Sequence, residues 1–165
     1  MINFDEVFNL MQISFPENEY RTYSDQKALL ENSRYHIITK ENEQKNIVAF
    51  LAFWSLGDFN FVEHLAVSPT CRGKGTGTKL VSEFISESSK PIILEIEPPV
   101  DDISTKRMKF YERLGFVLNE YQYFQIPLRE NDSPSELKIM SYPKKLNEEE
   151  FQNVKSIIYR GAYGV

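Results

Sequence analysis

The sequence predicts a mixed α/β domain, and three observations support this fold class. Apolar residues recur at helical spacing in some segments, such as 4–15, and form short runs rich in β-formers in others, such as 47–55. The two kinds of segment are mixed along the whole chain rather than gathered into separate parts. The length of 165 residues fits one domain, so we expect a single domain over residues 1–165.

Two helices are expected before the first strand. Apolar residues at helical spacing predict a helix over 4–15, which Pro16 ends. Ser24 is expected to be the N-cap of a second, short helix whose buried part is 28–30.

The remaining elements alternate between strands and helices. Strands are expected at 35–39, 47–55, 59–67, 92–97, 116–120 and 137–142. The turn at Gly57-Asp58 joins the second and third of these strands into a hairpin. Helices are expected after the glycine-rich stretch 72–77, over 104–114 and over 148–159. Gly115 fits a left-handed C-terminal cap, and Asn147 with Glu150 forms a capping-box pattern.

Composition and charge exclude several classes of function. The formal net charge of −5 disfavours nucleic acid and anionic membranes as partners, because both need a cationic face. The single cysteine, Cys71, excludes an intrachain disulfide, and His36 and His64 have no ligand spacing, so no metal site is expected. The first ten residues lack the features of a secretory signal, and no apolar run approaches the ~20 residues of a membrane span. A cytoplasmic location is therefore expected.

The most informative segment is a glycine-rich stretch between a strand and a helix. Gly73, Gly75 and Gly77 let the backbone approach a ligand closely, and Arg72 and Lys74 add positive charge. Unpaired N–H groups and the positive end of the helix dipole meet at such a turn. The arrangement predicts a site for phosphate or pyrophosphate.

Other nucleotide-binding motifs fit this segment less well. No stretch matches the P-loop pattern, and the G-x-G-x-x-G fingerprint fails because its third glycine falls on Thr78. Glu95, about 20 residues further on, keeps a dinucleotide site as an alternative. A tight turn without any ligand is the other alternative.

Two motifs together resemble the GNAT superfamily of acetyl-CoA-dependent N-acetyltransferases. Leu65-Ala66-Val67 followed by the 72–77 stretch resembles motif A of that family, and the Y-E-x-L-G-F motif is similar to residues 110–116. The resemblance covers about 45–120, which would be the cofactor-binding core, with a further strand and helix at 136–160. It implies a mixed, mostly antiparallel central sheet flanked by helices, with a splayed strand pair forming the acyl-CoA cleft.

The resemblance implies acetyl-CoA as co-substrate and assigns its contacts. The main chain at the strand end would pair with the pantetheine arm, through Leu65, Ala66 and Val67. The pyrophosphate would be held by the turn residues Arg72, Gly73, Lys74, Gly75, Thr76 and Gly77. Many members carry an asparagine about seven residues before the tyrosine, and here that position is Ser104. Ser104 is therefore a candidate pantetheine contact, or only a helix cap.

The resemblance also implies the reaction: direct attack of a primary amine, on a small molecule or peptide, on acetyl-CoA. Tyr111 matches the tyrosine that often acts as general acid in the family, and packing on the helix face is its alternative role. In the strand 92–97, alternation places Glu95 and Glu97 on one face, where each raises the other's pKa. Glu95 is one candidate base, Glu63 is a second, and a reaction without a single protein base stays open. A structural role is expected for His64.

The acceptor amine is not specified by the sequence. The acidic balance favours a cationic amine over an anionic one. Several other aromatic and polar residues could line an acceptor pocket, namely Tyr20, Arg21, Tyr23, Trp54, Tyr121, Tyr123 and Phe124. For most of them, however, a role in the core or in a dimer interface is expected. A homodimer is possible. The alternative from another functional class is a non-catalytic acyl-CoA sensor or regulatory protein of the same fold.

Overall fold

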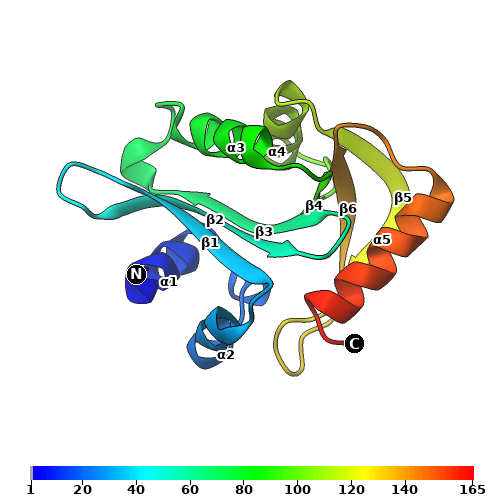
Figure 1. Cartoon of the computed structure of the whole chain (residues 1–165), viewed down its shortest axis with the longest axis horizontal. Helices are drawn as coiled ribbons and strands as arrows, with labels where there is room; N and C mark the ends of the chain where they lie inside the picture. The colour runs from blue at the N-terminus through cyan, green and yellow to red at the C-terminus, as the bar shows by residue number, and fades with distance from the viewer. Residues whose placement is uncertain (1) are drawn as a thin grey trace.

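The computed structural model describes residues 2–165, which contain one mixed sheet of six strands in the order β1-β2-β3-β4-β6-β5 (Figure 1). The strands are β1 (Tyr35–Glu41), β2 (Ile47–Ser55), β3 (Asn60–Val67), β4 (Ile92–Ile96), β5 (Val117–Gln125) and β6 (Ser135–Tyr142). Neighbours are antiparallel except for β3 and β4, which are parallel. The predicted mixed, mostly antiparallel sheet is confirmed.

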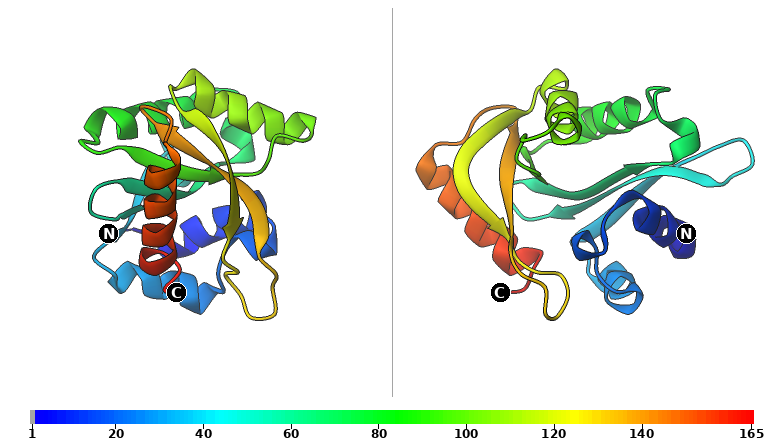
Figure 2. Two further views of the ribbon diagram at one scale, coloured as in Figure 1. Left: turned by 90° about the vertical axis from the view of Figure 1, so that its right-hand side faces the viewer. Right: turned by 180° about the vertical axis from the view of Figure 1, so that it is seen from behind.

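Helices cover both faces of this sheet (Figures 1 and 2). They are α1 (Phe4–Ser14), α2 (Tyr23–Ala28), α3 (Thr76–Glu87), α4 (Asp102–Arg113) and α5 (Glu148–Gly161), with short 3-10 turns η1 (Glu17–Glu19), η2 (Leu29–Glu31) and η3 (Pro69–Cys71). One apolar core lies between one face of the sheet and helices α1 and α5. A second core lies between the other face and helices α3 and α4.

Capping side chains set several helix starts, and one prediction was wrong here. The Asn147 and Glu150 capping box forms as predicted. At α2, however, Thr22 is the N-cap instead of Ser24, because its hydroxyl accepts the N–H of Asp25. The buried residue of α2 is Gln26 and not the apolar 28–30 segment. Its side chain accepts from the Arg21 N–H and donates to the Tyr35 hydroxyl, so polar contacts anchor this helix.

A β-bulge in β3 decides which side chains face each layer. Ala52 of β2 pairs with His64 and Phe53 pairs with Val62, so Glu63 is an extra residue without a partner on β2. Beyond the bulge the alternation of side chains changes phase, and both Glu63 and His64 face the layer of α1. The pairing of β3 with β4 also stops here, after Val62 opposite Leu94.

A buried ion pair fixes the bulge. Arg21 donates to both carboxylate oxygens of Glu63, at 2.6 and 3.1 Å, and the two side chains are 9% and 1% exposed. The Trp54 indole donates to the same carboxylate at 3.0 Å. Arg21 also donates to the backbone carbonyl of Ala162 at 3.2 Å. One arginine therefore ties the segment before α2 and the end of α5 to the centre of the sheet.

Replacing Arg21 by Met should destabilise the protein strongly, because it leaves the Glu63 carboxylate buried without its cation. Removing one partner of a buried pair costs about 3–5 kcal/mol. The free energy of unfolding in urea measures the loss. The matched control is Lys40→Met, which breaks the Lys40–Glu83 pair, whose side chains are 32% and 43% exposed. Exposed pairs contribute little, so a similar loss in both variants would contradict this reading of Arg21.

Candidate active site

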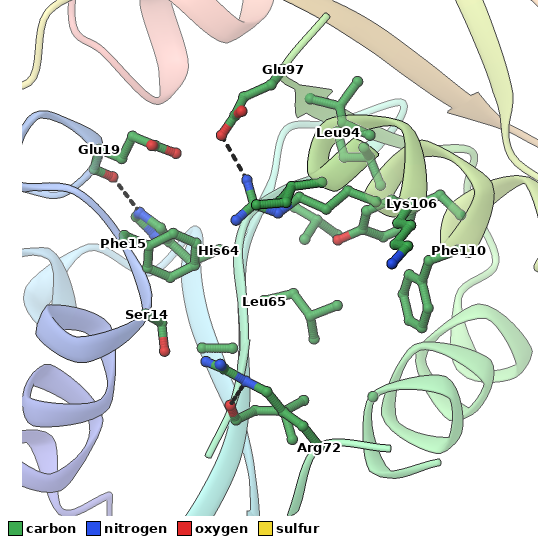
Figure 3. Close-up of a pocket in the computed structure, with 18 of the residues that line it drawn as sticks. Ser14, Phe15, Glu19, His64, Leu65, Arg72, Leu94, Glu97, Lys106 and Phe110 are labelled. Atoms are coloured by element: carbon green, nitrogen blue, oxygen red, sulfur yellow. Dashed lines mark hydrogen bonds and ion pairs between the residues drawn. The ribbon is translucent and has the colours of Figure 1, made fainter. Parts of the chain in front are cut away.

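A cavity of about 780 Å³ lies where β3 and β4 part (Figure 3). The end of α1, the η1 turn, the glycine-rich turn and α4 complete its walls. The lining includes most residues that the sequence assigned to a site, namely Glu63, Leu65, Ala66, Val67, Arg72, Gly73, Gly75, Thr76, Gly77, Glu95 and Tyr111. The fold thus brings together groups from positions 63 to 111.

On one wall, the outer part of β3 has a free edge. Its pairing with β4 ends at Val62, although its pairing with β2 continues through Val67. The backbone of 63–67 therefore has no strand neighbour on the cleft side. Such an edge can bind an extended ligand by main-chain hydrogen bonds, as an added strand does. The side chain of Arg72 folds over the end of this edge, where its Nε donates to the Val67 carbonyl at 3.1 Å.

The glycine-rich turn next to this edge has the form of an anion cradle. Gly73 and Gly75 have φ of +79° and +78°, in the left-handed region that glycine adopts readily, and no atom lies within 4 Å of where a Cβ would be. The first intrahelical hydrogen bond of α3 is donated by the Lys79 N–H to the Gly75 carbonyl. The N–H groups of 76–78 have no intrahelical acceptor and point out of the α3 start. These features suit a pyrophosphate.

Two residues predicted to bind the cofactor lie elsewhere. Lys74 is exposed and is not part of the cleft lining. Ser104 is 1% exposed and also outside the lining. Its N–H and its hydroxyl both donate to the Asp101 carboxylate, each at 2.8 Å, in the capping box that starts α4. Of the two roles open for Ser104, the structure supports the helix cap.

Glu95 is a half-buried residue at the point where β4 leaves β3. Burial is the largest effect on it and raises its pKa to about 7, and the charge of Glu63 acts in the same direction. Three donors moderate this rise: Tyr123 on one carboxylate oxygen, and Tyr163 at 2.7 Å and Gln125 at 3.2 Å on the other. All three donors are neutral, so no cation holds this carboxyl in its charged form.

The prediction that Glu95 and Glu97 lie on one strand face and raise each other's pKa was wrong. Glu97 lies just beyond the end of β4 and pairs with Arg107 of α4 at 2.6 Å (Figure 3). The carboxylate that acts on the pKa of Glu95 is Glu63, from the neighbouring strand. Because β4 ends at Ile96, the alternation of side chains along the strand does not extend to Glu97.

Glu63 does not fit the role of a base. Burial acts to raise its pKa, but the charge of Arg21 and hydrogen bonds from Arg21 and Trp54 outweigh burial and lower the pKa below the usual range. A carboxylate held ionised by two guanidinium hydrogen bonds is a weak proton acceptor. Its place next to the cleft is structural, as the anchor of the β3 bulge.

Tyr111 of α4 lines the cleft with its hydroxyl free. The ring packs edge-on against Phe110 and Phe116, with centroids 5.0 and 5.6 Å away. No group in residues 2–165 hydrogen-bonds to the hydroxyl. Burial raises the pKa of Tyr111 to about 12, so the phenol keeps its proton at neutral pH. The ring packs on its own helix, and the hydroxyl remains available as a donor.

His64 holds the η1 turn against β3. Its Nε2–H donates to the Glu19 carbonyl at 2.7 Å, and its ring packs against Phe15 at 5.0 Å. The side chain is nearly inaccessible, and burial lowers the pKa of His64, which keeps the ring neutral. Nδ1 is then an acceptor without a donor among the described residues, 3.5 Å from a Glu63 oxygen.

Several residues of the site escaped the sequence analysis. They are two of the donors to Glu95 (Gln125 and Tyr163) and the cleft residues Ile13, Phe15, Glu19, Ile103 and Arg107. The third donor, Tyr123, was named only in the set of residues that could line an acceptor pocket. Tyr123 and Gln125 alternate on β5, which was predicted to end at residue 120 but continues to Gln125. A longer strand would have placed these two side chains on one face. Nothing local marks Tyr163 or Glu19.

The comparisons with known proteins identify the family. Residues 4–116 match the model described as "Acetyltransferase (GNAT) family". The chain therefore belongs to the GNAT acetyltransferase family, as the resemblance indicated. It is 39% identical over 104 residues to the "Putative acetyltransferase YjbC" of Bacillus subtilis (strain 168), which is 62% of this chain and 52% of that protein. The match thus spans about half the length of this curated relative.

Solved structures share the fold. A protein from Bacteroides thetaiotaomicron described as "Putative acetyltransferase from GNAT family" has a TM-score of 0.89 and 27% identity, covering 98% of this chain and 92% of its own. The ribosomal-protein-S18-alanine N-acetyltransferase of Escherichia coli has a TM-score of 0.65 at 19% identity, covering 90% and 94%. A chimera of the Vibrio cholerae spermidine N-acetyltransferase SpeG has a TM-score of 0.63 at 17% identity, covering 86% and 92%. The last two likenesses show the fold alone.

Residues 2–165 contain no candidate membrane span and no candidate metal cluster. No helix in this range is long and apolar enough to cross a membrane. In the same range, no group of three or more His, Cys, Asp and Glu side chains is placed to hold a metal ion.

The raised pKa of Glu95 should appear in the pH dependence of stability. The folded pKa of about 7 lies above the ordinary 4.5, so folding favours the protonated form of the carboxyl. Its contribution to the free energy of unfolding is complete below pH 4.5. That contribution is lost as the pH rises through 7. Glu95→Gln should therefore gain stability relative to the wild type between pH 5 and 8, by roughly 3 kcal/mol.

Urea unfolding of both proteins across this pH range measures the effect. Glu17→Gln, at a glutamate whose side chain is 78% exposed, provides the control. A constant difference between wild type and Glu95→Gln would show that Glu95 titrates normally.

Proposed function

We propose that this chain is an acetyl-CoA-dependent N-acetyltransferase, which moves an acetyl group to a primary amine of a small molecule or peptide by direct attack. The observation that carries the proposal is the shared cleft. An anion cradle, a free strand edge, a carboxyl with a pKa near 7 and a protonated phenol all line one cavity. Membership of the GNAT acetyltransferase family supports the class of reaction.

The cofactor side of the cleft fits coenzyme A in charge and shape. The free N–H groups at the start of α3 and the open positions over Gly73 and Gly75 suit the pyrophosphate. The unpaired edge at 65–67 suits the amides of the pantetheine arm. Backbone groups make most of these contacts, which explains how an acidic protein can hold a polyanionic substrate. Arg72 supplies a cation at the junction of the two regions.

Glu95 is the proposed general base. An amine must lose a proton to attack a carbonyl, and a base works best when its pKa is near the working pH. The three donors to Glu95 occupy part of its hydrogen-bonding capacity, and a carboxylate has about four acceptor positions. One position is left for the proton of the attacking nitrogen.

Tyr111 is the proposed general acid. As the carbon–sulfur bond of the thioester breaks, the sulfur takes the electron pair and needs a proton. The Tyr111 hydroxyl has no other partner in the described range, and its pKa of about 12 keeps it protonated until that moment. The attacking nitrogen loses its proton to Glu95, and the sulfur gains one from Tyr111, so the proton count balances over the two residues.

Acetyl-CoA and coenzyme A should both raise the melting temperature, and thiol should be released when a panel of primary amines is added. NAD is the control, because a dinucleotide site would be stabilised by NAD instead. The absence of stabilisation by either CoA species would overturn the proposal. Stabilisation without thiol release from any amine would favour the non-catalytic acyl-CoA sensor.

The pH–rate profile should separate the two catalytic roles. A base with a pKa of about 7 makes kcat/KM rise as the pH increases through 7. Glu95→Gln should lower the rate by about 10²-fold and remove this rise, since general base catalysis is worth 10² or more. Tyr111→Phe should lower the rate without removing the rise or weakening CoA binding. An intact rise in Glu95→Gln would exclude it as the base.

A further inference from the structure

The acceptor half of the cleft contains a carboxylate that the mechanism does not use. Glu19 of the η1 turn is half-buried and lines the cavity, on the side opposite Glu97 (Figure 3). No side chain in residues 2–165 donates a hydrogen bond or forms an ion pair with its carboxylate. Burial raises its pKa, and the charge of Glu97 raises it further, while Arg107 acts in the opposite direction.

Glu97 also lines the cavity, and only one of its carboxylate oxygens accepts a hydrogen bond. Its Oε1 accepts a single bond from Nη1 of Arg107, and both side chains are about half exposed. At the mouth of the cleft, the charges that act on Glu19 are therefore one carboxylate and one guanidinium, which is already paired. Lys106 also lines the cavity, but it lies beside Phe110 (Figure 3), and Glu19 has no ion pair among residues 2–165.

A buried acceptor in the same half of the cleft also lacks a donor. His64 is 4% exposed and lines the cavity beside Glu19. Its Nε2–H is used on the Glu19 carbonyl, and its Nδ1 has no partner among the described residues. A neutral ring in this tautomer can only accept at Nδ1. An unsatisfied buried acceptor costs free energy, and the Glu63 oxygen 3.5 Å from Nδ1 is itself an acceptor, so this side of the cleft lacks a donor.

Apolar side chains lie between the polar groups. Ile13 at the end of α1 and Ile103 at the start of α4 line the cavity and are 65% and 67% exposed. Phe15 adds a partly buried ring beside His64. Large apolar side chains left exposed on the walls of a cleft are a surface that a ligand's hydrocarbon part can cover.

We propose that the acceptor is an aliphatic amine that carries a second cationic group, such as an α,ω-diamine. The reacting nitrogen lies at Glu95, the methylene chain covers Ile13 and Ile103, and the distal ammonium is held at the mouth by Glu19 and Glu97. The inference rests on the proposed acetyl transfer and names its substrate class. An ammonium group has three donors and no acceptor, which is what these groups require.

Three probes of equal chain length test the distal charge: 1,4-diaminobutane, butylamine and 4-aminobutyrate, whose distal ends are positive, neutral and negative. With the wild type, kcat/KM should fall in that order, with about tenfold between the first two, which corresponds to one ion pair of about 1.4 kcal/mol. Glu19→Gln should abolish the preference for the diamine, because kcat/KM should fall about tenfold more for the diamine than for butylamine.

The matched control is Glu17→Gln, in the same η1 turn, whose side chain is 78% exposed and lies 3.6 Å from Arg129. It should keep the preference for the diamine. Equal rates with the diamine and butylamine, or an unchanged preference in Glu19→Gln, would overturn the substrate class and leave acetyl transfer intact.

A binding measurement separates this proposal from the proposed reaction. Calorimetric titration of 1,4-diaminobutane into the protein saturated with coenzyme A requires no turnover. Binding that Glu19→Gln removes and Glu17→Gln retains would support a dicationic site even if no amine were acetylated. The absence of binding to the wild type would overturn it.

Discussion

The parting of two parallel strands is the constraint on which the rest of the structure depends. β3 and β4 pair over three residues and then separate, and the cavity, the free strand edge and the buried carboxyl all lie in the gap. The bulge at Glu63 marks the point of separation, because the extra residue changes the twist and phase of β3. Arg21 and Trp54 hold that residue in place from the layer of α1. A stabilising ion pair and a functional opening are therefore two consequences of one irregular residue.

Two glutamates on either side of this gap acquire opposite properties from their surroundings. Desolvation acts to raise the pKa of both, and the charge of Glu63 acts in the same direction on Glu95. Glu63 has a guanidinium in contact and stays ionised, whereas Glu95 has only phenol and amide donors and titrates near neutral pH. The two pKa values differ because of one charged neighbour, Arg21, rather than because of depth of burial. Pairs of carboxyls separated in this way are the usual means by which a site obtains a base at pH 7.

Local signals in the sequence predicted most of the fold and one half of the site. Periodicity, turns and caps give nearly all elements, and the glycine-rich turn with the strand before it was placed correctly at the cleft. Two of the outcomes that the sequence did not predict have different causes, one in tertiary pairing and one in a local helix cap. Strict alternation would place Glu63 and His64 on opposite faces, and only pairing with β2 creates the bulge. Ser104 was assigned by spacing from Tyr111, but Asp101 recruits its hydroxyl for the helix start.

The two halves of the cleft are encoded differently, and this limits what family membership implies. The half proposed to bind the cofactor comes from one continuous stretch, 65–77, which offers mainly backbone groups and glycines, so a short motif identifies it. The acceptor half is assembled from segments far apart in the chain, from Ile13 in α1 to Tyr163 after α5. Residues 117–165, outside the matched 4–116, supply every donor to Glu95. Two proteins can therefore share the motif and the fold while differing in the amine they accept, because the acceptor half depends on side chains that no contiguous motif specifies.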